Sequence, residues 1–104
     1  MGETKAAFLF VAPNAEPARD RAVIKIPSVL ELTVVGARNY EEAAAVSKEL
    51  VEEGNEVIEL CAGFGHIGVA EIVKAVEGKA KVGAVRFDAH PAMAFKSGDD
   101  VFVE

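Results

Sequence analysis

The chain has 104 residues, of which 51% are hydrophobic and 27% charged, and its formal net charge is -6. This length fits one globular domain and excludes the two mononucleotide-binding halves of a complete dinucleotide-dependent enzyme. The acidic balance, without clustered Lys and Arg, argues against a nucleic-acid surface. No segment approaches the ~18 consecutive apolar residues that a membrane span requires.

The single cysteine excludes an internal disulfide framework and is typical of a reducing compartment. No basic segment precedes the first apolar run, so no signal peptide is expected. Together these features predict a soluble cytoplasmic protein.

Apolar runs alternate with helical patterns along the whole chain, which predicts one α/β domain with four mainly parallel strands. Residues 6–12 form the first predicted strand and residues 29–36 the second. The polar link between them, ending at Pro27, leaves two alternatives: a crossover with a short helix over residues 17–23, or a hairpin.

The second predicted strand leads into a helix that starts with the capping pair Asn39 and Glu42 and ends near Gly54. Residues 56–63 form the third strand, and the helix that follows it stops at Gly78.

The fourth predicted strand covers residues 81–88, and residues 91–104 form a tail. The tail is expected either to add a short edge strand at residues 101–103 or to contact another subunit.

The strand pattern predicts a sheet with one polar face, because polar and apolar residues alternate along the strands. The polar set consists of Glu31, Thr33, Glu59, Cys61, Arg86 and Asp88. The apolar set consists of Leu30, Leu32, Val34, Ile58, Leu60, Val85 and Phe87. Because unpaired buried carboxylates are costly, the polar face must meet water, a ligand or a second subunit of a homo-oligomer.

Residues 63–68 match the pattern G-x-G-x-x-G between a predicted strand and a helix, and Asp88 follows at the end of the next strand. Glycine allows the backbone to approach a phosphate, and free N–H groups at a helix start attract an anion. The candidate ligand-binding residues of this loop are Gly63, Gly65, His66 and Gly68. Three alternatives stay open: a dinucleotide, a smaller anion, or a tight turn without a ligand.

Several reactive side chains converge on the carboxyl ends of the third and fourth strands, where open parallel sheets bind ligands. Arg86 would add positive charge for an anion, and a guanidinium near Cys61 would favour the thiolate. The candidates for proton transfer are Glu59, Cys61, Asp88 and His90. The alternative for Cys61 is that it only fills the core.

A metal is a further alternative, because His66, Asp88 and His90 offer nitrogen and oxygen ligands. Their spacing is unspecific, so no metal site is assigned, and the cofactor is unknown.

Nearly the whole chain resembles a family of small prokaryotic proteins catalogued as a domain of unknown function. The segments that carry this resemblance most specifically are ELCAGFGH and RFDAHP. The resemblance implies no known activity.

A local segment, residues 32–87, is similar to the first β-α-β stretch of the keto-deoxy-phosphogluconate aldolases. The resemblance would place Glu59 at the position of a catalytic glutamate. Those enzymes also need a Schiff-base lysine from a later strand, whereas Lys79 and Lys81 lie at the start of a strand. Aldolase activity is therefore not expected of this chain alone.

These patterns support two main hypotheses and leave open whether the protein is an enzyme. The first is a homo-oligomeric protein that binds a small phosphate- or carboxylate-bearing metabolite at the ends of the third and fourth strands. The alternative is a non-catalytic homo-oligomeric scaffold or partner-binding module that uses the polar sheet face and the tail. A nucleotide-binding module is a more distant third.

Overall fold

A computed structural model describes residues 3–87 and 89–103. The described strands are β1 (Thr4–Val11), β2 (Arg21–Ile26), β3 (Leu30–Ala37), β4 (Val57–Leu60) and β5 (Lys81–Ala84). The helices are α1 (Tyr40–Glu52) and α2 (His66–Val76), and two short 3-10 helices follow, η1 (Pro91–Met93) and η2 (Gly98–Asp100).

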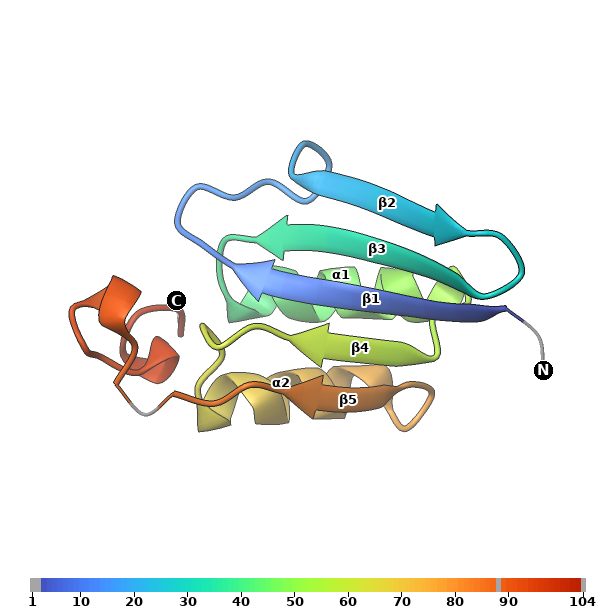
Figure 1. Ribbon diagram of the computed structural model, residues 1–104. Helices are drawn as coiled ribbons and strands as arrows, with labels where there is room; N and C mark the ends of the chain where they lie inside the picture. The colour runs from blue at the N-terminus through green and yellow to red at the C-terminus, as the bar shows by residue number, and fades with distance from the viewer. Residues whose placement is uncertain (1–2, 88, 104) are drawn as a thin grey trace.

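The strands form one five-stranded mixed sheet in the order β2-β3-β1-β4-β5 (Figure 1). β1, β3, β4 and β5 are parallel to one another, and β2 runs antiparallel to β3. The predicted α/β class with four parallel strands is confirmed, and β2 is an additional fifth strand at the edge.

The link between the first two predicted strands forms a hairpin, not a crossover helix. Residues 21–26 pair with β3 along their whole length. The turn begins with Pro27 and bends at Ser28, whose φ is 66°. The Val29 N–H closes this turn by donating to the Ile26 carbonyl at 3.0 Å, a geometry in which proline often precedes a residue with positive φ.

Both α-helices begin and end close to the predicted residues. The Asn39 side chain accepts a hydrogen bond from the Glu42 N–H at 2.9 Å and caps α1. Gly54 follows the helix with a φ of 99°, and Gly78 follows α2 with a φ of 76°. Glycine adopts this left-handed backbone without steric cost, which explains why it marks both helix ends.

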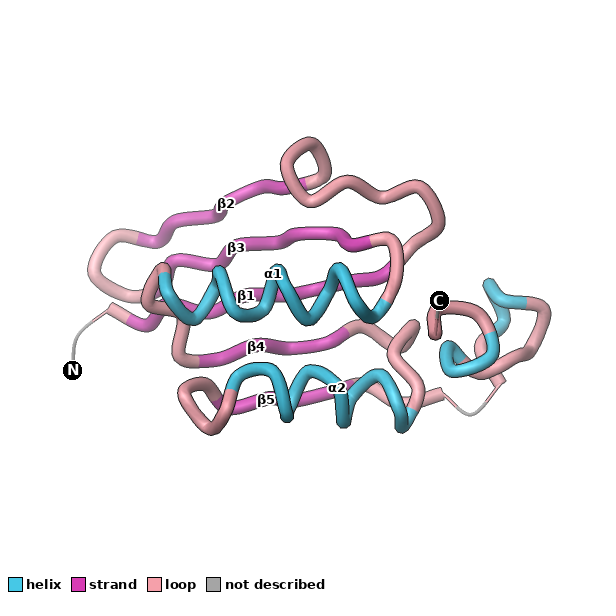
Figure 2. The backbone as a smooth tube through the Cα atoms, turned by 180° about the vertical axis from the view of Figure 1, so that it is seen from behind, coloured by secondary structure: helices cyan, strands magenta, loops and turns pink. Residues whose placement is uncertain are grey.

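The two α-helices lie on the same side of the sheet, so the fold has two layers (Figure 2). The hydrophobic core fills the space between these layers. Its largest fully buried side chains include Leu9, Leu50, Ile58, Leu60, Phe64 and Ile72. We call the opposite side of the sheet, which carries Phe8, Val34 and Glu59, the open face.

The prediction of one polar sheet face is wrong. Thr33 pairs with Ala7 and is only 5% exposed, on the side of the sheet that faces the helices. Glu59 pairs instead with Phe8, which lies level with Val34 on the open face. Because β1 lies between β3 and β4, the repeated sequence pattern of these two strands does not give their relative register.

The members of the two predicted sets are therefore divided between the faces. Glu31 lies on the helix side and forms ion pairs with Lys5 at 3.3 Å and Lys25 at 3.5 Å. Ile58 and Leu60 also lie on this side, within the core, whereas Leu30, Leu32 and Val34 lie on the open face.

The tail forms no edge strand at residues 101–103. The predicted fourth strand ends earlier than expected, at Ala84, and the chain then turns through η1 and η2 beside the carboxyl ends of β1 and β4 (Figure 1). Phe102 anchors the tail because its side chain is only 4% exposed and its ring lies 6.3 Å from that of Tyr40. Within the described residues, no helix has the length and apolar character needed to cross a membrane.

Candidate functional site

The connections that follow β1 and β4 leave the sheet in opposite directions. β1 and β4 are neighbours in the sheet. The chain runs from β1 through β2 to β3, which lies on one side of this pair, and from β4 through α2 to β5, which lies on the other side. In open α/β sheets this divergence creates a crevice at the carboxyl ends of the strands, and ligands bind there.

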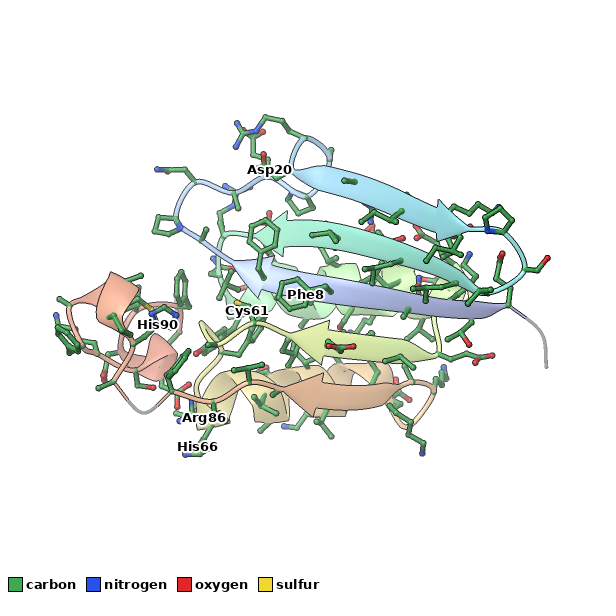
Figure 3. All side chains as sticks on the ribbon, viewed as in Figure 1. Phe8, Asp20, Cys61, His66, Arg86 and His90 are labelled. Atoms are coloured by element: carbon green, nitrogen blue, oxygen red, sulfur yellow. The ribbon has the colours of Figure 1, made fainter. Side chains whose placement is uncertain are left out.

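A pocket of about 220 Å³ lies at this position. It is lined by residues of the β1 end, the β4 end and the tail: Val11, Ala12, Pro13, Cys61, Ala62, Gly63, His90, Ala92, Met93 and Phe102. Cys61 and His90 lie at the same end of the molecule (Figure 3). We call this hollow the Cys61–His90 pocket.

Cys61 is the residue immediately after β4, and its backbone N–H continues the pairing by donating to the Leu9 carbonyl at 3.1 Å. Its side chain is half-buried and the thiol is free. The sulfur accepts a hydrogen bond from the Gly63 N–H at 3.3 Å. This hydrogen bond fixes the orientation of the side chain beside the Gly63 backbone.

His90 is held by the short loop that contains η1. Its N–H donates to the Lys96 carbonyl at 3.0 Å, and its Nδ1 accepts from the Ala92 N–H at 3.1 Å. The centroid of its ring lies 5.3 Å from that of the Phe87 ring, and the two rings meet edge to face. Since Nδ1 acts as an acceptor, the proton of the neutral imidazole is on Nε2. The ring therefore has a defined orientation and a donor at Nε2.

Among the described residues, the remainder of the pocket lining is mostly apolar and contains no carboxylate. Val11, Pro13, Met93 and Phe102 form its walls. A volume of about 220 Å³ lies below the ~300 Å³ at which pockets for drug-sized ligands begin. The pocket therefore suits a molecule smaller than a nucleotide.

The start of α2, where the glycine pattern predicted an anion, holds a carboxylate of the chain itself. Asp99 accepts hydrogen bonds from the Ile67 N–H at 3.0 Å and the Gly68 N–H at 3.2 Å. The Tyr40 hydroxyl donates to the same carboxylate at 2.9 Å and accepts from the Gly65 N–H at 2.9 Å. We call these residues the Tyr40–Asp99 cluster.

The cluster determines the ionisation of both side chains. Burial raises the pKa of the Tyr40 phenol, so the hydroxyl keeps its proton and can donate a hydrogen bond to Asp99. Burial alone would also raise the pKa of Asp99, but the hydrogen bonds from Ile67, Tyr40 and Gly68 outweigh it and lower this pKa.

The glycines of the motif have packing roles that require no ligand. A side chain at Gly65 would collide with the Asp99 carboxylate, and one at Gly68 would collide with the Tyr40 ring. Gly98 lies so close to the Gly63 carbonyl that a side chain has no room there either. An exogenous anion at the start of α2 would have to displace Asp99.

The other predicted site residues lie outside the pocket. Arg86 donates from Nη1 to the carbonyls of Phe64 and Phe87, both at 3.2 Å. His66 is exposed at the first position of α2, and Glu59 is exposed on the open face. Asp88 lies outside the described residues. Thus the structure brings together Cys61, Gly63 and His90, while Gly65, Gly68 and Arg86 lie around α2.

The described part of the chain contains no group of three or more His, Cys, Asp or Glu side chains placed to hold a metal ion. His66 and His90, two of the three proposed ligands, belong to different segments, α2 and the tail.

Sequence patterns did not single out Tyr40, Asp99 or Met93. One signal was available for Asp99, because Ser97 and Asp100 form a capping box around η2 and the pattern of Ser followed three residues later by an acid predicts such a helix start. That pattern does not show which distant segment an acidic side chain will reach.

A second, wider hollow lies elsewhere, along the exposed sides of α1 and α2. Its volume is about 720 Å³, and its lining includes Glu41, Glu49, Glu52 and Glu71. Its four carboxylates outnumber the one lysine of the lining, Lys48, so the groove disfavours anions, and neither the thiol nor an imidazole lines it. We therefore place the candidate site at the smaller Cys61–His90 pocket.

Comparison with known proteins identifies a family without an assigned activity. No curated protein and no solved structure matches the chain. The model of a family of unknown function, DUF6506, matches residues 4–100, which include every strand and both α-helices. The chain therefore belongs to the DUF6506 family.

Proposed function

We propose that the protein binds a small metabolite with a phosphate or carboxylate group in the Cys61–His90 pocket, at the carboxyl ends of β1 and β4. One observation carries the proposal. A free thiol and an imidazole of defined orientation line the same pocket, at the point where the connections of the sheet diverge.

The pocket lining supports an anionic ligand. Among the described residues it contains no carboxylate, and the ring of His90 offers an N–H donor for a ligand oxygen. The Nε2–H can donate to a ligand oxygen because Nδ1 is already used as an acceptor.

The start of α2 is not included in the proposed site. Its N–H groups already donate to Asp99, and breaking these charge-assisted bonds would oppose binding. Of the residues considered for proton transfer, Cys61 and His90 line the pocket. They would carry that role if the ligand is also a substrate.

Alkylation of the thiol tests the charge preference of the pocket. Cys61 is the single cysteine of the chain, so its reaction with iodoacetate or iodoacetamide reports on this pocket alone. We expect the ratio of the iodoacetate rate to the iodoacetamide rate to be about tenfold higher in the folded protein than in urea, because a hydrogen bond to a charged group contributes about 1.5–3 kcal/mol.

The two histidines supply a matched pair of variants. His90→Gln should reduce the rate ratio to that of the unfolded chain, whereas His66→Gln, at an exposed position outside the pocket, should leave it unchanged. A folded wild-type protein with the same ratio as the unfolded chain would refute the proposal. An equal decrease in both variants would refute the role of His90.

A second candidate function is a non-catalytic homo-oligomeric scaffold. The uncovered apolar side chains of the open face favour it, and it requires no preference for iodoacetate at Cys61. Nucleotide binding receives less support, because Asp99 occupies the start of α2 and the pocket is small. We also propose that the protein is cytoplasmic, since a free thiol is typical of a reducing compartment.

A further inference from the structure

The open face is the one large apolar surface of the sheet that no helix covers within the described residues (Figure 1). Six of its large side chains come from the adjacent strands β1, β2 and β3. These are Phe8, Phe10, Ile24, Ile26, Leu32 and Val34.

The side chains of the open face do not belong to the core, which lies on the helix side of the sheet. Ile24 is 54% exposed and Ile26 is 47% exposed. Parallel strands normally have both faces covered, and contiguous apolar patches of this kind on a protein surface usually mark an interaction site. The face therefore lacks a partner in the single chain.

The charges of the open face fit a second copy of the same chain. One acid, Glu59, and one base, Lys81, are present among its described strand residues. The chain as a whole has a net charge of -6, and several of its acids line the groove on the helix side. Two copies would repel one another at that side, so the open face is the surface through which they can meet.

The size of the face agrees with such a contact. Five strands of four to eight residues, with strands ~4.8 Å apart and ~3.3 Å per residue, cover roughly 500 Å² in projection. This projection is more than half of the ~800 Å² that each partner contributes to a standard interface. Homodimer contacts are also the more apolar class of interface.

We propose that two copies of the chain form a symmetric dimer by packing their open faces against each other. Each copy contributes the same surface, as a twofold axis requires. The two sheets would lie ~10 Å apart with interleaved side chains, as in a β-sandwich. The dimer does not depend on the ligand proposed for the Cys61–His90 pocket.

Two neighbouring residues of β2 allow a matched test. Ile24 lies on the open face and is 54% exposed, whereas Val23 lies on the opposite side of the same strand and is 56% exposed. Sedimentation equilibrium should give the wild type a mass twice the 11.0 kDa of one chain. Ile24→Lys should raise the dimer dissociation constant at least about 100-fold, because each dimer would bury two unpaired charges.

Val23→Lys should leave the dimer intact, since it adds the same charge to the other side of the strand. Ile26→Lys provides a second disrupting variant, and circular dichroism would establish that each variant is folded. A wild type that stays monomeric at ~100 µM would overturn the proposal and leave the face to a different partner. Folded Ile24→Lys and Ile26→Lys proteins that both remain dimeric, or equal dissociation of Val23→Lys, would also overturn it.

Discussion

Asp99 joins three segments that are distant in sequence: the start of α1 through Tyr40, the start of α2 through two N–H groups, and η2, to which it belongs. A helix start normally leaves N–H groups without partners inside the helix. Here a carboxylate from the tail supplies the partner, which also brings the tail over the carboxyl ends of β1 and β4.

We expect Asp99→Asn to lower the free energy of unfolding by about 1–3 kcal/mol, because it removes the charge from several part-buried hydrogen bonds. Urea denaturation would measure the loss. Asp100→Asn is the control, since Asp100 is exposed and bonds locally to the Ser97 N–H at 3.3 Å. Equal stability of Asp99→Asn and the wild type would contradict the structural role of Asp99.

The same carboxylate predicts a pH dependence. The folded-state pKa of Asp99 is lowered from 3.8, so its contribution to stability is present above pH 3.8 and is lost as the pH falls through the lower, folded pKa. The difference in melting temperature between wild type and Asp99→Asn should therefore be constant near neutral pH and shrink in acid below that value. A difference that grows on acidification would show that the pKa is raised instead.

Two glycines offer a further comparison at the residue scale. Gly65→Ala would place a methyl group against the Asp99 carboxylate, whereas Gly83→Ala meets no atom within 4 Å. We expect Gly65→Ala to destabilise the protein by about 1–3 kcal/mol, as other overpacking substitutions do, and Gly83→Ala to change its thermal unfolding little. The reverse order would contradict the packing explanation for the glycine motif.

The β2–β3 hairpin adds an antiparallel edge strand, β2, to the four predicted parallel strands. Its turn places Ser28 at a φ of 66°, a conformation that glycine adopts more readily. Ser28→Gly should therefore keep or raise the melting temperature. Ser28→Val should lower the free energy of unfolding by about 1–3 kcal/mol, because a β-branched residue is strained at positive φ.

Thermal unfolding of both Ser28 variants, followed by circular dichroism, measures this difference. Val29→Thr is a suitable control, since Val29 is 59% exposed and is the neighbouring residue of the same turn. If Ser28→Val were as stable as Ser28→Gly, the turn geometry would be wrong.

Local signals predicted the α-helices well, because Asn39, Gly54 and Gly78 act on the residues beside them. The hairpin was left as one of two alternatives, since the short pattern of residues 21–26 does not determine a partner strand. The assignment of residues to sheet faces was wrong because it needs the register across β1, which places Glu59 level with Val34. Register between strands that are not neighbours in sequence depends on tertiary pairing.

At the scale of the whole molecule, the candidate site combines the ends of β1 and β4 with the tail. The position of Cys61 and Gly63 at the carboxyl end of a strand followed from the predicted α/β order. The predicted order did not show that Asp99 would accept hydrogen bonds from the first N–H groups of α2, because that contact joins residues 31 or more positions apart. The similarity of one stretch to aldolases stays a resemblance, and Glu59 is exposed on the open face.

The two proposals assign separate surfaces to separate roles: the pocket to a small anion and the open face to a second copy of the chain. His90, which tests the pocket, and Ile24, which tests the open face, lie in different parts of the chain. A result at one surface therefore leaves the other proposal to be judged on its own measurement.

The central claim is that the thiol and the imidazole face the same small anion. The most direct measurement is a crystal structure of the protein with Cys61 carboxymethylated by iodoacetate, which attaches one carboxylate to the sulfur. We predict that this carboxylate lies about 3 Å from Nε2 of His90, inside the pocket. A carboxymethyl group directed away from His90, toward the open face or solvent, would contradict the account.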